Sequence, residues 1–323
     1  MNLRIGSRGS QLALWQAKHI ATLLRGQGHS VEITIIKTTG DRLQEVTFAQ
    51  VGSKGMFTKE IEEALAAKRV DLAVHSLKDL PTELPEPFTL AATPPRVDPR
   101  DAFVSVICEN LAALPKGARV GTSSQRRRAQ LKALRPDIAT VEFRGNVDTR
   151  LRKMAEGQVD AILLASAGLD RLEKTEWVRE RMEPREFCPA AGQGALGIET
   201  RKDDAVTIAA VAFLDDATTR FAVTAERAAL ATLGGGCQVP IGIYCRTGLG
   251  EVTGSRPELW DEIFAVVASP ETGKSVRIYH RETRHRAPDA GADPASLGRL
   301  AAQMLIDAGA GPLLAAATTG GLK

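Results

Sequence analysis

A strand and helix pattern that occurs twice most constrains the fold of this chain. Residues 4–7 read as a short strand that leads through glycine and a hydroxyl side chain into a helix, and residues 119–123 repeat that order. Residues 70–74 and 159–163 are two similar apolar runs, typical of buried strands. Strands that alternate with helices in this way predict parallel sheets flanked by helices. We therefore expect two related α/β units, separated by a proline-rich hinge at residues 93–100.

The last third of the chain has a different pattern. A helical run at residues 223–233 is followed by three glycines and Cys237, and two β-like runs follow at residues 263–268 and 276–279. A final amphipathic helix is expected at residues 297–306. Two strands joined by a tight turn, together with helices, predict a small antiparallel α+β domain.

Positive charge is concentrated in one stretch although the 323-residue chain has a net charge of only +3. Residues 119–153 contain ten basic and three acidic side chains. Such a patch either attracts an anionic partner or is a solvated helix face. Its only aromatic residue is Phe143, whereas proteins that bind nucleic acids often combine cations with stacking aromatic rings. We therefore expect no nucleic-acid partner.

The sequence gives no sign of a membrane or secreted protein. No uncharged apolar stretch approaches the roughly 18 residues of a membrane span, and Arg4 and Arg8 interrupt the region where a signal peptide would need an apolar run. The cysteines are dispersed, at Cys108, Cys188, Cys237 and Cys245. Their spacing predicts neither a metal site nor a disulfide framework, so we expect a cytoplasmic protein with reduced thiols.

The glycines at 192, 194 and 197 match the spacing of a dinucleotide-binding loop. Residues 186–191 are a poor strand, and residues 197–200 look extended where a helix should begin. The context therefore favours a chain crossing between domains over a nucleotide site.

Cationic and hydroxyl side chains recur where predicted strands pass into helices. They occur at residues 7–10, 121–128 and 144–150. A helix start presents unpaired N–H groups, and arginine can hold a carboxylate with two hydrogen bonds. The loops also fall at the carboxyl ends of strands, where crevices form. The pattern favours a ligand with several carboxylates, and a solvated arginine face is the alternative.

Two further positions allow a structural and a functional interpretation. Asp79 follows a buried strand and precedes a Leu-Pro pair, so it is either a turn former or a carboxylate that stabilises positive charge on a substrate. Cys237 is either a small buried apolar residue or a thiol presented on a glycine-rich loop for covalent attachment.

Six motifs in colinear order resemble those of the porphobilinogen deaminase family, also called hydroxymethylbilane synthases. They are RIGSRGSQLALWQ at 4–16, VHSLKD at 74–79, GTSS at 121–124, RGN at 144–146, GQG at 192–194 and GCQVP at 236–240. The resemblance runs from about residue 3 to about residue 310.

This resemblance implies an α/β protein with three domains. Two lobes are expected to be similar to those of type II periplasmic binding proteins, with mixed sheets flanked by helices, and the third is an α+β domain with an antiparallel sheet. We expect domain 1 at residues 1–95 and 193–215, domain 2 at 96–192 and domain 3 at 216–323. A monomer fits the resemblance.

The resemblance also implies an activity. In the family, four porphobilinogen molecules are condensed head to tail, each losing ammonia, onto a dipyrromethane cofactor, and hydrolysis releases hydroxymethylbilane. The cofactor is attached through a thioether to the cysteine that matches Cys237, so that each condensation is effectively intramolecular. Asp79 matches the catalytic carboxylate, which stabilises the positive charge left on the substrate ring when ammonia departs.

The carboxylates of cofactor and substrate are expected on a set of cationic and hydroxyl side chains. By resemblance these are Arg8, Ser10, Lys78, Ser123, Ser124, Arg126, Arg127, Arg144, Arg150 and Arg171. Lys54, Ser76 and Gln193 are further cleft candidates. Gln125 and Gly234 depart from the family pattern, without changing a group that has an assigned chemical role.

A solute-binding protein for a small polycarboxylate is the main alternative. It would explain the arginine-rich loops and the two α/β units. It would not explain the glycine-rich loop that carries Cys237.

Overall fold

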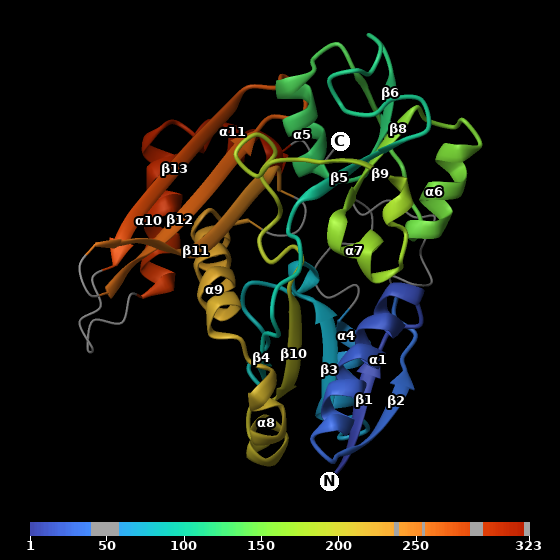
Figure 1. Ribbon diagram of the computed structural model, residues 1–323, viewed down its shortest axis with the longest axis vertical. Helices are drawn as coiled ribbons and strands as arrows, with labels where there is room; N and C mark the ends of the chain where they lie inside the picture. Colours follow the sequence, from blue (N-terminus) through green and yellow to red (C-terminus); the bar gives the residue numbers. More distant parts are fainter. Residues whose placement is uncertain (40–57, 236–238, 254–255, 285–292, 320–323) are drawn as a thin grey trace.

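The computed structural model describes residues 1–39, 58–235, 239–253, 256–284 and 293–319. Three β-sheets organise these residues (Figure 1). In this view the second sheet lies above the first, and the third lies to the left of both.

The first sheet has the strand order β2-β1-β3-β10-β4. Its strands are β1 (Asn2–Ser7), β2 (Ser30–Ile35), β3 (Leu72–Ser76), β4 (Phe88–Ala92) and β10 (Leu196–Arg201). β1 is parallel to β2 and β3, whereas β10 is antiparallel to β3 and β4. The helices of this lobe are α1 (Gln11–Gly26), α4 (Lys59–Ala66) and α8 (Ala205–Val211), with short 3₁₀ turns η1 (Leu77–Asp79) and η3 (Ala212–Leu214).

The second sheet repeats this arrangement in the order β7-β6-β8-β5-β9. Its strands are β5 (Asp101–Ser105), β6 (Arg119–Gly121), β7 (Ala139–Val141), β8 (Ala161–Ala165) and β9 (Val178–Arg181). β6 is parallel to β7 and β8, and β5 is antiparallel to β8 and β9. Its helices are α5 (Gln125–Leu134), α6 (Val147–Ala155) and α7 (Ser166–Arg171), with a 3₁₀ turn η2 (Thr175–Trp177). The prediction of two related α/β units is confirmed.

The third sheet is antiparallel, in the order β11-β12-β13. It consists of β11 (Ile241–Thr253), β12 (Arg256–Ala268) and β13 (Ser275–Arg284), with helices α9 (Ala217–Thr232), α10 (Pro294–Asp307) and α11 (Gly311–Thr319). The sequence predicted β12, β13 and the two longer helices but not β11. Glycines obscure the strand pattern of β11, and one of them has a packing role: a Cβ on Gly248 would lie 2.1 Å from the Trp260 ring of β12.

Aliphatic side chains form the interior of each lobe. On α1, Ala17, Ile20, Ala21 and Leu24 are fully buried at the spacing of one helix face, and they pack against the first sheet. Burying one side chain such as Ile20 contributes about 1.5 to 3 kcal/mol.

The chain passes from the first sheet to the second through residues 93–100 and returns through residues 182–195, and we call these two stretches the crossing segments. Gly194 has a φ of +87°, and a Cβ there would lie only 2.7 Å from the carbonyl oxygen of Val97. Gly192 also has a positive φ, of +73°. Gly194 lets the two crossing segments approach each other, whereas Gly192 packs against the turn after β3, where a Cβ would lie 3.2 Å from the backbone nitrogen of Lys78. The next strand, β10, is extended. The interpretation of this motif as a domain crossing is confirmed.

Among the helices in the described ranges, none combines the length and apolar character that a bilayer crossing requires.

Candidate functional site

The carboxyl ends of β1 and β3 form one wall of a small pocket. Because the two strands are parallel neighbours, the residues that follow them emerge at the same edge of the sheet. The pocket has a volume of about 70 Å³, and its lining includes Arg8, Ser10, Ser76 and Asp79. The structure therefore brings together four side chains that the sequence placed in separate motifs, and Asp79 is exposed to solvent there.

Local hydrogen bonds hold the pocket residues in place. The Ser10 hydroxyl caps α1 by accepting from the backbone N–H of Ala13 at 3.3 Å. The buried side chain of Gln16, one and a half turns along the same helix, donates from Nε2 to the Ser76 hydroxyl at 2.8 Å. Gln16 lies in the motif at residues 4–16, but the motif alone did not predict a role for its side chain.

A buried pair behind the pocket ties β3 to β10. His75 Nε2 and Glu199 Oε2 are 2.9 Å apart, and Glu199 is fully buried. This contact anchors the strand one residue before Ser76. Sequence reasoning missed it because the partners are 124 residues apart.

Lys78 connects the pocket to the second lobe. Its ammonium group donates to Gln193 Oε1 at 3.5 Å. Burial lowers the pKa of Lys78 to about 8; the nearby Arg127 and Arg126 act in the same direction, while Asp79 and Asp101 oppose them. Lys78 thus lies within electrostatic reach of charged groups from both lobes.

Asp101, the first residue of β5, is the centre of a buried ionic network. Arg126 contacts its carboxylate at 2.6 and 3.2 Å, and Arg127 contacts it at 2.7 and 3.0 Å. Gln193 Nε2 adds a hydrogen bond of 3.0 Å. Burial raises the pKa of Asp101, but the two guanidinium groups outweigh burial and hold the pKa well below its usual range. Arg126 and Arg127 are therefore buried and engaged within the protein, and their contact with ligand carboxylates stays a prediction.

The sequence analysis did not single out Asp101. The available signal was an acidic residue at the start of an otherwise apolar strand, next to an arginine-rich region. A carboxylate in that setting needs a cationic partner, because an unpaired buried charge is costly.

Arg150 and Arg171 each have one buried donor atom that makes no hydrogen bond to the described residues. Within the described part of the chain, the Nε atoms of both residues lack a hydrogen-bond partner. Burial lowers the pKa of each to about 10, and at Arg150 the neighbouring Arg127 and Arg144 add to the effect. Unsatisfied cationic donors of this kind suit an anionic ligand.

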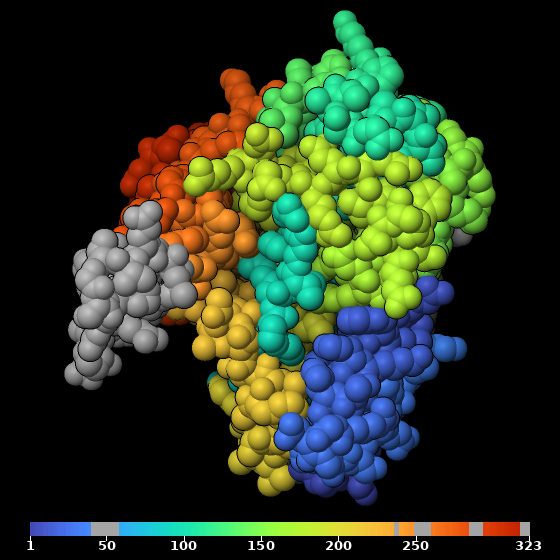
Figure 2. Space-filling view, viewed as in Figure 1, coloured from blue at the N-terminus to red at the C-terminus, as the bar shows by residue number. Residues whose placement is uncertain are grey.

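Arg171 lies where the two lobes meet. It is the last residue of α7, its Nη2 donates to the carbonyl oxygen of Gly194 at 2.8 Å, and its guanidinium lies 5.9 Å from the Trp15 ring of α1. Figure 2 shows this junction where the blue surface of the first lobe meets the yellow-green surface of the second.

The remaining predicted residues of the second lobe lie at two helix starts. Ser124 caps α5 by accepting from the N–H of Arg127 at 3.4 Å, and Ser123 lies beside it, half-buried. Arg144 precedes α6 and donates to Glu142 at 2.7 Å. Lys54 and Cys237 lie outside the described residues, so the structure gives no account of them.

The pocket around Asp79 combines an exposed carboxylate with a guanidinium group and the hydroxyl groups of Ser10 and Ser76, and Lys78 lies within electrostatic reach of Arg126 and Arg127 of the second lobe. Such a site can bind a molecule with several carboxylates. The same site can stabilise positive charge at the position that Asp79 faces.

Family comparisons cover most of the chain. Residues 3–209 match the family model described as porphobilinogen deaminase, dipyromethane cofactor binding domain. Residues 220–307 match the model described as porphobilinogen deaminase, C-terminal domain.

Two curated relatives are similar over nearly the whole length. Porphobilinogen deaminase of Nitratidesulfovibrio vulgaris (strain DSM 19637 / Miyazaki F) is 49% identical, with 97% of this chain and 96% of that protein covered. Porphobilinogen deaminase of Roseiflexus sp. (strain RS-1) is 48% identical, with 97% and 98% covered.

Solved structures show a more distant likeness. A putative methionine-binding lipoprotein from Bacillus subtilis has a TM-score of 0.42 at 13% identity, with 66% of this chain and 89% of that chain covered. A pheromone precursor lipoprotein from Enterococcus faecalis has a TM-score of 0.43 at 13% identity, with 65% and 90% covered.

Proposed function

The chain belongs to the porphobilinogen deaminase family, and we propose that Asp79 and the cations around it form the site of that family's reaction. The protein is a hydroxymethylbilane synthase of tetrapyrrole biosynthesis. Four porphobilinogen molecules are joined head to tail with loss of ammonia, and hydrolysis releases the linear product. The observation that carries the site assignment is the pocket in which Asp79 meets Arg8, Ser10 and Ser76.

The dipyrromethane cofactor fits the side chains of this chain. Each of its two rings carries an acetate and a propionate, so it needs several cationic or hydroxyl partners. The Nε atoms of Arg150 and Arg171 are buried donors without a partner among the described residues, as such a group requires. When bound, the dipyrromethane supplies the pyrrole carbon onto which the chain grows.

We propose that one set of cationic and hydroxyl side chains binds the carboxylates of cofactor and substrate. These residues are Arg8, Ser10, Lys78, Ser123, Ser124, Arg126, Arg127, Arg144, Arg150 and Arg171. Ser76, Gln193 and Lys54 are assigned to the same cleft. Support comes from the position of most described members at the carboxyl ends of strands and at helix starts of the two lobes. Arg171, the last residue of α7, is included for its buried Nε, which has no hydrogen-bond partner among the described residues.

Asp79 is assigned the catalytic role. Its carboxylate accepts a hydrogen bond from the pyrrole N–H of the substrate and stabilises the positive charge that develops as ammonia leaves. Lys78 and Arg8 hold the substrate carboxylates nearby, so that the reacting ring is oriented before the bond breaks.

Cys237 is assigned as the attachment point of the cofactor. The test is the intact mass of purified protein, which we expect to include a dipyrrolic adduct. Cys237→Ser should lack the adduct, whereas Cys108→Ser, a control at a half-buried free cysteine, should keep it. An unmodified folded chain that still turns over porphobilinogen would refute the attachment.

The role of Asp79 is tested by steady-state turnover of Asp79→Asn. We expect kcat to fall on the order of 10²-fold, since removing one stabiliser of developing charge typically has that effect. Glu83→Gln, an exposed carboxylate four residues away, should leave turnover unchanged. Near-normal kinetics of Asp79→Asn would remove Asp79 from this role.

We also propose the domain boundaries, the oligomeric state and the cellular location of the protein. We place domain 1 at residues 1–95 and 193–215, domain 2 at 96–192 and domain 3 at 216–323, with one β-sheet at the centre of each. A cytoplasmic monomer is supported by the family's reaction and by the free thiols of Cys108 and Cys188. Light scattering during size-exclusion chromatography measures the oligomeric state, and a mass twice that of the chain would overturn the monomer.

A further inference from the structure

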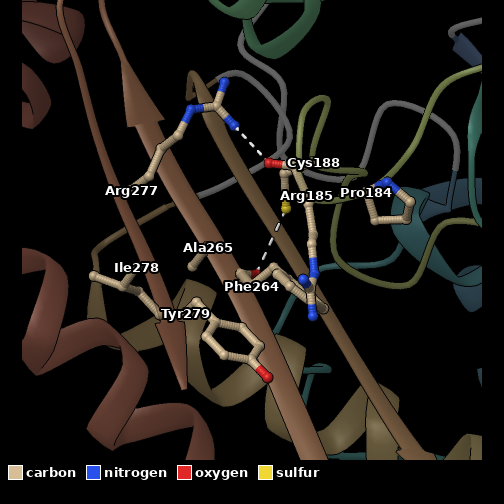
Figure 3. Close-up of a pocket in the computed structure, with 8 residues that line it drawn as sticks. All are labelled: Pro184, Arg185, Cys188, Phe264, Ala265, Arg277, Ile278 and Tyr279. Carbon is tan, nitrogen blue, oxygen red and sulfur yellow. Dashed lines mark hydrogen bonds between the residues drawn. The ribbon is translucent and has the colours of Figure 1, made fainter. Parts of the chain in front are cut away.

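A second pocket lies on the third sheet, away from Asp79 (Figure 3). Its volume is about 330 Å³, within the range of small-molecule sites. Arg185 and Cys188 come from the crossing segment, Phe264 from β12, and Arg277, Ile278 and Tyr279 from β13. The pocket therefore lies between the second lobe and the third domain.

Aromatic rings and guanidinium groups together define the chemistry of this pocket. The Arg185 guanidinium is 5.5 Å from the Phe264 ring and 5.1 Å from the Tyr279 ring. Arg277 donates to the carbonyl oxygen of Arg185 through a long hydrogen bond of 3.3 Å. Arg185, Arg277 and Tyr279 are all exposed, so a molecule from solvent can reach them.

The charge around the pocket is positive. Glu262 is an acidic group beside the pocket, and it contacts Arg246 at 2.8 Å, Arg281 at 3.4 Å and the Tyr279 hydroxyl at 3.1 Å. Glu262 lies 4.0 Å from Arg185. Glu186 acts on Arg277 from the crossing segment. The surroundings of the pocket therefore contain more positive than negative charge: Glu262 and Glu186 lie among four arginines, which are Arg185, Arg246, Arg277 and Arg281.

We propose that this pocket binds a planar aromatic carboxylate that acts as an effector of the enzyme. The ring packs on Tyr279 and Ile278, and the carboxylate pairs with Arg277 and Arg185. A purely apolar ligand would leave both guanidinium groups unused, and a cation would be repelled by them.

Cys188 links this pocket to the cationic site of the two lobes. Its carbonyl oxygen accepts from Arg126 Nη1 at 2.8 Å and from Gln130 Nε2 at 2.9 Å, and Arg126 in turn binds Asp101. Its thiol donates to the Phe264 carbonyl oxygen at 3.5 Å. On the other side, a Cβ on Gly242 would lie 2.7 Å from the Cys188 carbonyl oxygen, so this backbone has little room to move. Because this packing couples Cys188 to β11 and its carbonyl oxygen binds Arg126, a ligand that contacts Cys188 acts on the orientation of Arg126 through one residue.

Binding is tested with naphthalene-2-carboxylate and the purified full-length protein by titration calorimetry. We expect saturable binding that weakens about tenfold in Arg277→Gln and less in Arg277→Lys, which keeps the charge. Tyr279→Leu should also weaken binding. Arg144→Gln, a change in the cleft, should leave the affinity unchanged. Equal unfolding midpoints of these variants and wild type serve as the folding control.

Three results would overturn the site. They are the absence of binding at millimolar probe, loss of binding in Arg144→Gln but not in Arg277→Gln, and equal affinity for the uncharged 2-naphthol. The first excludes a ligand of this class, the second places the probe in the cleft, and the third removes the role of the guanidinium groups.

The effector role is tested by porphobilinogen turnover below saturation. Saturating probe should change the wild-type rate at least twofold, while Arg277→Gln should show wild-type turnover without probe and no response to it. Because coupling between two binding free energies is reciprocal, any change that the probe causes in the affinity for porphobilinogen must equal the change that porphobilinogen causes in the affinity for the probe. A wild-type rate that is identical with and without probe would refute the effector role.

Discussion

Arg96 and Glu226 form a buried ion pair in which both terminal guanidinium nitrogens reach the carboxylate, Nη1 to Oε1 at 2.6 Å and Nη2 to Oε2 at 3.2 Å. Arg96 belongs to the first crossing segment and Glu226 to α9 of the third domain. The same carboxylate accepts from the backbone N–H of Gly192 at 2.6 Å and of Cys245 at 2.8 Å. One fully buried side chain therefore joins both crossing segments to α9 and β11.

Glu226→Gln should lower the free energy of unfolding by about 3 to 5 kcal/mol, because it leaves Arg96 buried without its counter-charge. Urea unfolding measures the change. Arg299→Gln is the matched control, since its pair with Asp293 is exposed and should be worth under about 1 kcal/mol. Equal losses in the two variants would contradict the role of Glu226 as the junction.

Asp101→Asn should destabilise the protein at neutral pH but not at strongly acidic pH. The pKa of Asp101 is lowered on folding, so its stabilisation is present above the unfolded value of 3.8 and is lost as pH falls below it. We expect the free energy of unfolding of the variant to be about 3 to 5 kcal/mol lower than that of the wild type at pH 7. The difference should be the same at pH 5 and smaller below pH 4. Urea unfolding across this range measures the difference, and a difference that does not change with pH would show that Asp101 acts through packing alone.

Lys78 should limit activity at alkaline pH. Its pKa of about 8 means that the free enzyme loses this positive charge as pH rises through 8, so kcat/KM for porphobilinogen should fall there. Arginine stays charged over this pH range, so Lys78→Arg should move the fall in kcat/KM to higher pH. Wild type and variant are compared with the same substrate. Identical pH profiles would exclude Lys78 as a carboxylate-binding group. The free energy of unfolding should change with pH in the opposite direction. Because the unfolded chain holds the Lys78 proton more tightly than the folded protein, the charged side chain lowers the free energy of unfolding below pH 8. This destabilisation disappears as pH rises from 8 to 10.5.

Arg150→Gln should lower kcat/KM for porphobilinogen without lowering the free energy of unfolding. The side chain is a buried cation whose Nε has no partner among the described residues, so its removal relieves a desolvation cost. We expect kcat/KM to fall about 10- to 100-fold and the free energy of unfolding to stay equal or rise. Arg152→Gln, on the same helix but exposed, should change neither quantity. A loss of stability with unchanged kinetics would make Arg150 a structural residue.

Short-range patterns in the sequence accounted for much of the architecture and part of the site. The repeated strand and helix order predicted both lobes, and the positions after predicted strands located Arg8, Ser10 and Asp79. These features are readable because strand and helix periods, caps and strand ends depend on residues only a few positions apart. Where this local signal is weak, as in glycine-rich β11, prediction failed.

Tertiary structure alone decided which charges meet. Nothing local indicates that Asp101 receives both Arg126 and Arg127, that Gln193 reaches Asp101 across 92 residues, or that His75 pairs with Glu199. The sequence by itself determined which residue types stand at the strand ends and, through its motifs, the family. Packing of the lobes determined which arginines are paired with a carboxylate inside the protein and which have a donor without a partner among the described residues. A buried charge takes its partner from whatever the fold brings within hydrogen-bond distance.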